Sequence, residues 1–255
     1  MTKRSLVSCL TVIALVMIAP ATFAQTAAVA AEPSPSMLEV PADRIIDATC
    51  DQSPCALSAG TWTLQGPHTF ILGMQVTVPD GWQSLESDAG EFNLFQLAHP
   101  DGHIFMVKDI AATTTDGTNQ LVPDVPSTAD GLWAYWDDDP NVVVSELTPI
   151  TIAGGLDAVT FTAGVSPDAE FADPECPVYP RCAAMFTDPR YWDGFYAVGA
   201  PEVVRFYMAT AMNGDEPYLF VVGLEGETEA ALERLTADAA PIIESIRLPE
   251  EFPVW

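Results

Sequence analysis

The segment from Arg205 to Leu248 constrains the fold more than any other part of the chain. Two apolar runs separated by Asn213-Gly214-Asp215 predict a pair of strands, and a periodic stretch from about Thr228 follows them. Apolar residues in that stretch recur at spacings of three and four, which is typical of one buried helix face. They are Leu232, Leu235, Ala239, Ile242, Ile243 and Ile246. The two preceding strands are the nearest surface against which this stripe can be buried.

Earlier apolar runs predict that the sheet is covered on both sides. Glu91 to Leu97 and His103 to Ile110 are apolar on both faces, and Pro100-Asp101-Gly102 between them is typical of a hairpin turn. A helix is expected to start at Ser127, with Asp130 as its capping-box-like partner. Because two apolar faces need two layers of cover, we predict an α/β (α+β) fold with a mainly antiparallel sheet covered by helices.

Further strands and one insertion complete this pattern within a single globular domain over residues 41–255. Strands are expected at Gly60 to Leu64, Phe70 to Val78, Asn141 to Ile152 and Leu156 to Val165. The last two are predicted to form a hairpin across Gly154-Gly155. Residues 166–199 carry no clear period and are predicted to be an irregular insertion.

The beginning of the chain predicts export. Lys3 and Arg4 precede an apolar run from Leu6 to Ile18, and small residues lead up to Ala24. This order is typical of a secretory signal peptide over residues 1–24. A membrane span needs about 20 apolar residues, so the mature chain is expected to have no integral membrane segment, with an uncleaved anchor as the alternative. Residues 25–40 are rich in Ala, Pro and Ser and are interpreted as a flexible linker.

The charge of the chain excludes two classes of partner. Two of the nine basic residues precede the expected cleavage site, which leaves seven basic residues against 36 acidic ones, a net charge of −29. Such a chain is repelled by nucleic acid and by anionic lipid. Self-repulsion also weakens the compact state unless salt or cations screen it. Composition leaves open whether the acidity reflects adaptation to salt or cation binding.

Four cysteines remain after Cys9 is removed with the signal peptide. They are Cys50, Cys55, Cys176 and Cys182. An even number in an exported chain predicts two disulfides, and four cysteines allow three connectivities. We predict the local pairs Cys50–Cys55 and Cys176–Cys182. A zinc site is the alternative, although zinc sites prefer a tighter Cys-x2-Cys spacing.

The histidines limit the catalytic chemistry that the chain can offer. The sequence has His68, His99 and His103, with no Gly-x-Ser-x-Gly elbow and no His-Glu-x-x-His motif. If the hairpin loop is Asp101-Gly102, His99 and His103 point to opposite faces and cannot share a metal. If the loop has three residues, they lie opposite each other and can. Because no third ligand is close in sequence, we interpret both as solvated residues beside a turn.

An aromatic cluster in the insertion is the candidate ligand-binding surface. It consists of Tyr191, Trp192, Phe195 and Tyr196 and lies between acidic residues. Aromatic rings beside carboxylates can hold a sugar or a peptide, and long loops often carry function. The alternative is that these rings pack against the sheet, as alternating aromatic residues commonly do.

Three consecutive carboxylates are the candidate calcium ligands. Asp137, Asp138 and Asp139 follow the predicted middle helix. Their spacing differs from that of an EF-hand loop, which has a central glycine and a terminal glutamate. The alternative is a solvated helix end.

Several short segments together resemble the Mog1/PsbP-like α/β/α sandwich group. They are an early strand running into Val78-Pro79-Asp80-Gly81-Trp82, the helix after Ser127, and a last helix that ends in Glu244-Ser245-Ile246-Arg247-Leu248. The resemblance covers most of Gly60 to Leu248. The group includes photosystem accessory proteins, a Ran-binding factor and bacterial envelope lipoproteins, so the resemblance implies an accessory or binding role without catalytic residues. The insertion and the acidity depart from the group, and neither the photosystem role nor the Ran role suits this chain.

These observations predict a secreted, disulfide-bearing, non-catalytic domain that binds a cell-envelope component or a partner protein. Calcium is the one cofactor that the sequence suggests. The alternatives are a carboxylate-based hydrolase and an acidic cation-binding protein. A pocket with two carboxylates about 5 to 10 Å apart would favour the hydrolase. A shallow aromatic surface would favour the binding domain.

Overall fold

A computed structural model describes residues 44–47, 55–65, 71–85, 95–116, 118, 120–169, 179, 181–187 and 195–251. The chain divides into two units, Met1–Glu39 and Val40–Trp255, and all of the described residues belong to the second. The predicted signal peptide and linker lie outside the described residues, as do Cys50, Cys176, Tyr191 and Trp192.

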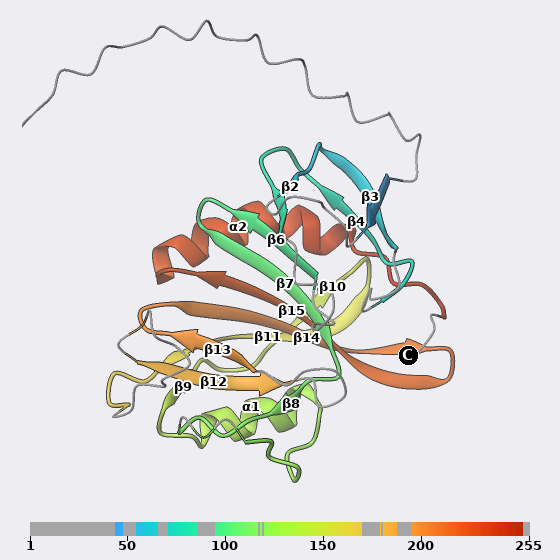
Figure 1. The fold of residues 1–255 in the computed structure, drawn as a ribbon. Coiled ribbons are helices and arrows are strands. Elements are labelled where there is room, and N and C mark those ends of the chain that lie inside the picture. The colour runs from blue at the N-terminus through green and yellow to red at the C-terminus, as the bar shows by residue number, and fades with distance from the viewer. Residues whose placement is uncertain are drawn as a thin grey trace, which may run out of the picture. The chain divides into compact units, whose positions relative to one another are not determined.

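The described part of the chain is mostly antiparallel β-structure with two helices (Figure 1). The strands are β1 Arg44–Asp47, β2 Cys55–Ala56, β3 Gly60–Gln65, β4 Gln75–Val78, β5 Gln83–Leu85, β6 Phe95–His99, β7 Gly102–Lys108, β8 Ala111–Ala112, β9 Val142–Val144, β10 Thr148–Ile152, β11 Leu156–Val165, β12 Cys182–Thr187, β13 Tyr196–Gly199, β14 Val203–Asn213 and β15 Glu216–Gly226. The helices are α1 Ala129–Asp137 and α2 Glu229–Ser245. Within the described strands, only β1 and β3 pair in parallel.

The strands form one large sheet and two small ones. The nine-stranded sheet has the order β10-β11-β14-β15-β7-β6-β5-β2, with β9 also paired to β11. The three-stranded sheets are β1-β3-β4 and β13-β12-β8. At the centre of the large sheet, β14 and β15 pair along their whole length, from Val203 opposite Gly226 to Asn213 opposite Glu216. Gly214 turns the chain between them with φ +59°. The predicted strand pair is therefore confirmed, and both strands are longer than expected.

Helix α2 buries the stripe that its sequence predicts. Thr228 caps its first turn, because the Thr228 hydroxyl accepts from the Ala231 N–H at 3.2 Å. All six residues of the predicted stripe are at most 4% exposed and share one core with β4, β7 and β15. Burying a side chain of this size contributes about 1.5–3 kcal/mol, so this face fixes the helix on the sheet.

The central sheet is covered on both faces, as two apolar strand faces predict. Along β7, Ile104 and Met106 belong to the core beneath α2, whereas Phe105 and Val107 belong to a second core. That second core also contains Trp136 of α1 and residues of β12 and β13. Figure 1 shows α2 on one side of β7 and β15, with α1, β8, β12 and β13 on the other. Neighbouring residues of one strand therefore lie in different environments.

Two details of the prediction were wrong. The N-cap of α1 is Thr128, whose hydroxyl accepts from the Gly131 N–H at 3.1 Å, while the Ser127 hydroxyl donates to the Ile110 carbonyl at 2.6 Å. The expected irregular insertion contains β12 and β13, which join β8 in a sheet. All residues of β12 are buried, so the segment shows no alternation and forms a strand where periodicity gave no signal.

Candidate functional site

A tight hairpin places the two described histidines on opposite faces of the sheet. His99 pairs with Gly102 and Ala98 pairs with His103, so the loop has two residues, Pro100-Asp101, one position earlier than in the two-residue alternative Asp101-Gly102. Because side chains alternate along a strand, this register separates His99 from His103, as the two-residue alternative predicted. Gly102 has φ +144°, and a Cβ there would lie 1.9 Å from the Glu225 carbonyl oxygen. The close approach of the hairpin to β15 therefore requires glycine.

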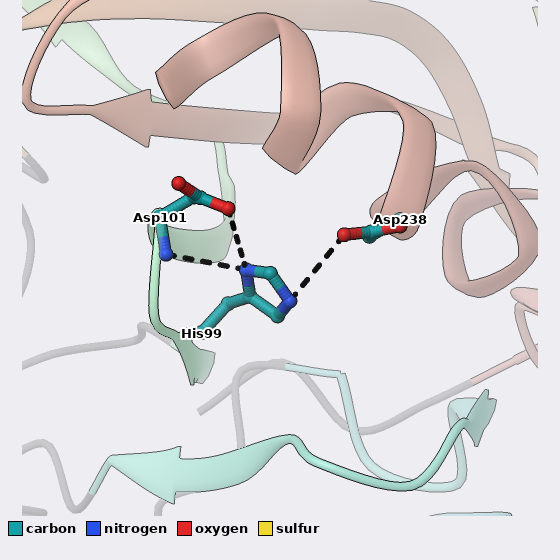
Figure 2. A group of neighbouring side chains, drawn as sticks. All are labelled: His99, Asp101 and Asp238. Atoms are coloured by element: carbon teal, nitrogen blue, oxygen red, sulfur yellow. Dashed lines mark hydrogen bonds and ion pairs between the residues drawn. The ribbon is translucent and has the colours of Figure 1, made fainter.

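The His99 ring rests on a buried tryptophan. Trp82 is 3% exposed, and its ring centroid lies 4.7 Å from that of His99, with the ring planes tilted by 35°. The His99 side chain is itself 15% exposed. Contact with a large fixed ring restricts the imidazole, while its edges face the hairpin turn on one side and α2 on the other (Figure 2).

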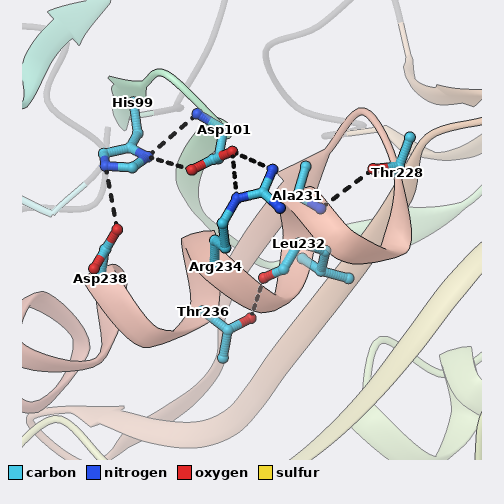
Figure 3. A network of polar contacts seen from close by, with 8 residues as sticks. All are labelled: His99, Asp101, Thr228, Ala231, Leu232, Arg234, Thr236 and Asp238. Atoms are coloured by element: carbon cyan, nitrogen blue, oxygen red, sulfur yellow. Dashed lines mark hydrogen bonds and ion pairs between the residues drawn. The ribbon is translucent and has the colours of Figure 1, made fainter.

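Helix α2 supplies two charged residues to this site. Arg234 and Asp238 are four positions apart, a spacing that places them on the same helix face. Arg234 donates from Nε and Nη2 to Oδ1 of Asp101, at 2.9 and 2.6 Å (Figure 3). Hydrogen bonding from Arg234 also holds the pKa of Asp101 below its ordinary value. An exposed pair of this kind adds little stability, so its main effect is to fix the direction of the Asp101 carboxylate.

Two carboxylates flank the imidazole at opposite edges. Asp101 Oδ2 lies 3.9 Å from His99 Nδ1, and Asp238 Oδ2 lies 3.6 Å from His99 Nε2 (Figure 2). The three residues can each offer a ligand atom, and these atoms lie within 4.8 Å of one another. The Asp238 side chain is 59% exposed, whereas that of Asp101 is 22% exposed. We refer to His99, Asp101 and Asp238 as the hairpin site.

The two edges of the ring have different chemical roles. The Asp101 backbone N–H donates to Nδ1 at 3.3 Å, which leaves the ring proton on Nε2, facing Asp238. A cation bound between His99 and Asp238 would replace that proton. The imidazole has a single ring proton, so it would then take the tautomer protonated at Nδ1. Asp101 Oδ2, 3.9 Å away, would have to move closer to accept that proton, and the Asp101 N–H would lose Nδ1 as its acceptor. Carboxylates commonly orient metal-binding imidazoles in this way.

The geometry at Nε2 suits a small divalent cation. Ligand bonds of about 2.0–2.2 Å at tetrahedral angles place two ligand atoms about 3.3–3.6 Å apart. The separation of Nε2 from Asp238 Oδ2 is 3.6 Å. Asp101 lies at the other edge of the ring, so it acts on the ring rather than as a ligand. His99 and Asp238 are therefore the two residues that could hold the ion, and the remaining positions would be open to water or to another molecule.

Sequence reasoning considered His99 but missed Asp238. The two residues are far apart in the chain, and Asp238 lies outside the apolar stripe by which the sequence predicts the last helix. A signal was present, because Arg234 and Asp238 share a helix face that the hairpin turn can reach. A basic and an acidic residue with this spacing, considered together with an aspartate in a turn, would have pointed to the contact.

The predicted aromatic surface is only partly within the described residues. Phe195 is half-buried, while Tyr191 and Trp192 lie outside. Tyr196 is the first residue of β13, and its ring packs against Phe105 and Phe186, with centroids 4.6 and 4.7 Å away. Tyr196 thus takes part in the core packing that was the alternative interpretation. Ligand binding by this cluster stays a prediction.

The three predicted calcium ligands lie at the end of α1. Asp137 is the last helical residue, and Asp138 is the C-cap. Asp139 accepts from the Thr115 hydroxyl at 2.6 Å and from the Asn141 N–H at 2.8 Å. Its carboxylate is thus already bound by the protein, while the other two side chains are exposed. Calcium binding at this position stays a prediction.

Disulfide bonding is recorded for one of the four cysteines, Cys182. Cys182 is fully buried at the start of β12 and takes part in a disulfide. Cys55 lies in β2, and Cys50 and Cys176 are outside the described residues. The pairs Cys50–Cys55 and Cys176–Cys182 therefore stay predictions.

Comparison with known proteins leaves the family open. No protein-family model and no curated protein matches the chain. A solved structure that is similar is the crystal structure of LpqN, described as involved in cell envelope biogenesis of Mycobacterium tuberculosis. It is 13% identical over 69% of this chain and 84% of that chain, with a TM-score of 0.39. Likeness of this degree establishes neither a shared family nor a shared function. In the described part of the chain, no helix is long and apolar enough to cross a membrane.

Proposed function

We propose that this protein is a secreted, disulfide-bearing, non-catalytic binding domain of the cell envelope that holds a divalent transition-metal cation at the hairpin site. Export follows from the signal peptide that residues 1–24 predict. The Mog1/PsbP-like resemblance of the sequence agrees with an accessory or binding role. The structural observation that carries the proposal is the 3.6 Å separation of His99 Nε2 from Asp238 Oδ2.

The ligand set favours zinc and related ions over calcium. Imidazole nitrogen suits zinc, nickel and copper, whereas calcium takes six to eight oxygen ligands. The hairpin site offers one nitrogen and one carboxylate to the ion, and Trp82 and Asp101 keep the ring in place. Calcium, which the sequence suggested as the cofactor, would find too few oxygen atoms here.

The number of ligands favours binding over catalysis. Catalytic zinc sites typically have three protein ligands and one water. The hairpin site provides two protein ligands, His99 and Asp238, so an ion there would have open positions that a group on an envelope component or partner protein can fill. A cation also offsets part of the net charge of −27 that the whole chain carries.

The geometry gives less support to the alternative of a carboxylate-based hydrolase. Glycosidases separate their two carboxyls by about 5 Å or more. A hydrolase of this kind needs both carboxyls in the wall of one pocket. One pocket of about 460 Å³ opens near the start of α1 and has a single carboxylate in its wall. Its lining residues are Asp109, Ala111, Ser127, Thr128, Thr210, Pro217, Tyr218 and Leu219.

The proposal is tested by titrating zinc into the purified, chelator-treated protein at about pH 7, where imidazole ligands are largely neutral. One equivalent is expected to bind. His99→Ala and Asp238→Asn should each weaken binding by about 100-fold or more, because loss of a ligand exceeds the 10- to 100-fold effect of an outer-shell residue. The double variant Asp137→Asn, Asp138→Asn is the matched control, since it removes two exposed carboxylates at another position.

The experiment distinguishes three explanations of the acidic composition, which are zinc binding at the hairpin site, calcium binding at the end of α1, and adaptation to salt. Zinc binding that survives both hairpin-site variants would overturn the proposed site. Calcium binding lost in the Asp137→Asn, Asp138→Asn variant would instead support the predicted calcium ligands. Equal stabilisation by sodium and calcium at matched ionic strength would favour adaptation to salt.

The predicted aromatic surface is a separate part of the proposal. If Tyr191, Trp192 and Phe195 hold a sugar or peptide, a thermal-shift screen with oligosaccharides and peptidoglycan fragments should give a shift that Trp192→Ala abolishes. Phe186→Leu is not a suitable control, because Phe186 is buried in the core. Val143→Ala is suitable, since Val143 is an apolar residue that is 54% exposed on β9.

A further inference from the structure

The pocket beside the start of α1 is a second candidate site, separate from the hairpin site. Its volume of about 460 Å³ falls within the range of about 300–1,000 Å³ that is usual for small-molecule sites. Its wall is formed by β14, β15 and the segments that follow β7 and precede α1. Leu219 in this wall belongs to the second core, so the pocket lies on the α1 side of the sheet, whereas the hairpin site lies on the α2 side.

An unusual backbone conformation places Asp109 in the wall of this pocket. Asp109 has φ +51°, in the left-handed region that residues other than glycine seldom adopt. Its N–H donates to the Leu219 carbonyl at 2.9 Å, and its Oδ1 accepts from the Leu219 N–H at 3.1 Å. These two bonds fix the carboxylate beside β15. Glycine or asparagine would adopt this conformation as readily, so what aspartate adds at this position is its charge.

The carboxylate of Asp109 determines which ligands the pocket favours. Among the described residues of the wall, Asp109 carries the charge, and no basic side chain accompanies it. A carboxylate can accept several hydrogen bonds at once, so the bond to Leu219 holds it in position without preventing it from accepting others. A ligand with a positively charged hydrogen-bond donor is therefore attracted, and an anionic ligand is repelled.

The rest of the wall combines apolar surface with hydroxyl groups. The Ser127 hydroxyl donates to the Ile110 carbonyl at 2.6 Å, and the Thr128 hydroxyl accepts from the Gly131 N–H at 3.1 Å. Because a hydroxyl has one donor and two acceptor positions, Ser127 can still accept a hydrogen bond and Thr128 can still donate one. The apolar residues are Ala111, Pro217 and Leu219. This mixture suits a ligand with an apolar body and one strongly polar end.

We propose that this pocket binds a small organic amine, whose protonated amino group hydrogen-bonds to the Asp109 carboxylate while its apolar body lies against Ala111 and Pro217. A metal ion would find a single carboxylate in the described part of the wall, which is too few ligands for a stable site. An amine needs one such partner and gains from the apolar contacts as well. The site goes beyond the proposed cation binding by His99 and Asp238 and does not depend on it.

Three probes with alkyl chains of similar length test the proposal, because they differ mainly in the polar end. Hexylamine, hexanol and hexanoate are each titrated at about pH 7 into the purified, isotope-labelled protein, and the dissociation constants are obtained from the amide NMR signals of Asp109 and Leu219. Hexylamine is protonated at this pH. We expect it to bind about tenfold more tightly than hexanol, because it adds a hydrogen bond to a charged group, and we expect no binding of hexanoate.

Asp109→Asn tests the role of the carboxylate. Asparagine tolerates the same backbone conformation and keeps an oxygen that can accept from Leu219, so the variant removes the charge with little other change. It should weaken hexylamine binding by about tenfold and leave hexanol binding unchanged. Asp215→Asn is the matched control, since it removes an exposed carboxylate from the turn between β14 and β15 and should bind hexylamine like the unchanged protein.

A second variant tests the pocket without touching the carboxylate. Thr210 is an exposed wall residue on β14, so Thr210→Phe fills the pocket with a ring that a strand accommodates well, and it should weaken hexylamine and hexanol alike. This variant replaces Asp109→Asn if that protein does not fold. Failure of hexylamine to bind, equal binding of hexylamine and hexanoate, or hexylamine binding that survives either pocket variant would overturn the proposal.

Discussion

His99 and His103 belong to one hairpin and lie four positions apart, but their surroundings differ completely. His99 faces α2, with Trp82 beneath its ring and carboxylates at both edges. His103 faces the second core, beside the buried carboxyl of Glu225, whose pKa is raised to about 8 by burial. The first histidine can exchange its Nε2 proton for a cation. The second is kept neutral by burial, which lowers its pKa to about 4.

This difference shows that the register of a hairpin determines which chemical environment each side chain meets. A two-residue turn at Pro100-Asp101 separates the two side chains, and the covering layers then determine what each ring meets. On one face the cover is a helix with charged residues on its exposed side. On the other face it is β13, whose tyrosine hydroxyl enters the core. A shift of one residue in this hairpin would exchange the two environments.

The largest effect on stability is expected from Gly102→Ala, which distorts the hairpin that places both histidines. The new Cβ would meet the Glu225 carbonyl oxygen at 1.9 Å, and φ is +144°. Strain and clash together should lower the free energy of unfolding by about 4 kcal/mol. Gly155→Ala is the matched control, because Gly155 has φ +130° and a Cβ at that position would have no neighbour within 4 Å. Similar losses in urea denaturation for both variants would show that the contact with β15 is unimportant.

A smaller effect is expected from His103→Gln and depends on pH. Because the pKa of His103 falls from 6.5 to about 4 on folding, the unfolded chain binds the extra proton between these values. Acidification through this window therefore weakens the fold. Relative to the unchanged protein, His103→Gln should gain about 3 kcal/mol in its free energy of unfolding as the pH falls. Denaturation of both proteins across this range measures the difference.

Glu225→Gln should show the opposite sign in a different window. The pKa of Glu225 rises from 4.5 to about 8, so the folded protein keeps a proton that the unfolded chain releases as the pH rises. The unchanged protein thus loses stability as the pH rises between these values. The free energy of unfolding of Glu225→Gln should therefore increase relative to that of the unchanged protein. If both variants differ from the unchanged protein by constant amounts, the two groups do not titrate as their burial requires.

The smallest effect is expected from Asp101→Asn, which tests whether the turn residue contributes to zinc binding at the hairpin site. Asp101 orients the His99 ring without reaching the cation position, so zinc affinity should fall by about tenfold. Arg234→Gln, which leaves the Asp101 carboxylate without its guanidinium partner, should have a weaker effect in the same titration. Complete loss of zinc binding in Asp101→Asn would mean that Asp101 is itself a ligand.

Much of the fold could be predicted because its signals are local. The stripe from Leu232 to Ile246 follows the helix period, and the long strand pair before it is marked by a turn at Gly214. These patterns depend on residues close in sequence, where geometry leaves few choices. Strand β12 was missed because a run such as Ala183-Ala184 has no alternation, since both of its faces are buried.

The sites could not be predicted in the same way, because they depend on contacts between distant segments. Asp238 reaches His99 only after α2 packs across the hairpin. Glu225 meets Tyr196 only when β13 lies on the second core. With 36 acidic residues in the chain, no single carboxylate stands out until tertiary structure selects its neighbours. The turn residues near His99 were noted, but the register of the hairpin determined their role.

Side-chain nitrogen NMR of the histidines during a zinc titration tests the central comparison most directly. The chain has three histidines, so their signals can be assigned with single His→Gln variants. We predict that zinc shifts the Nε2 signal of His99 at about pH 7, where its imidazole can bind a cation, and leaves the signals of His103 unchanged. A zinc-dependent change at His103, or none at His99, would contradict the assignment of cation binding to the α2 face.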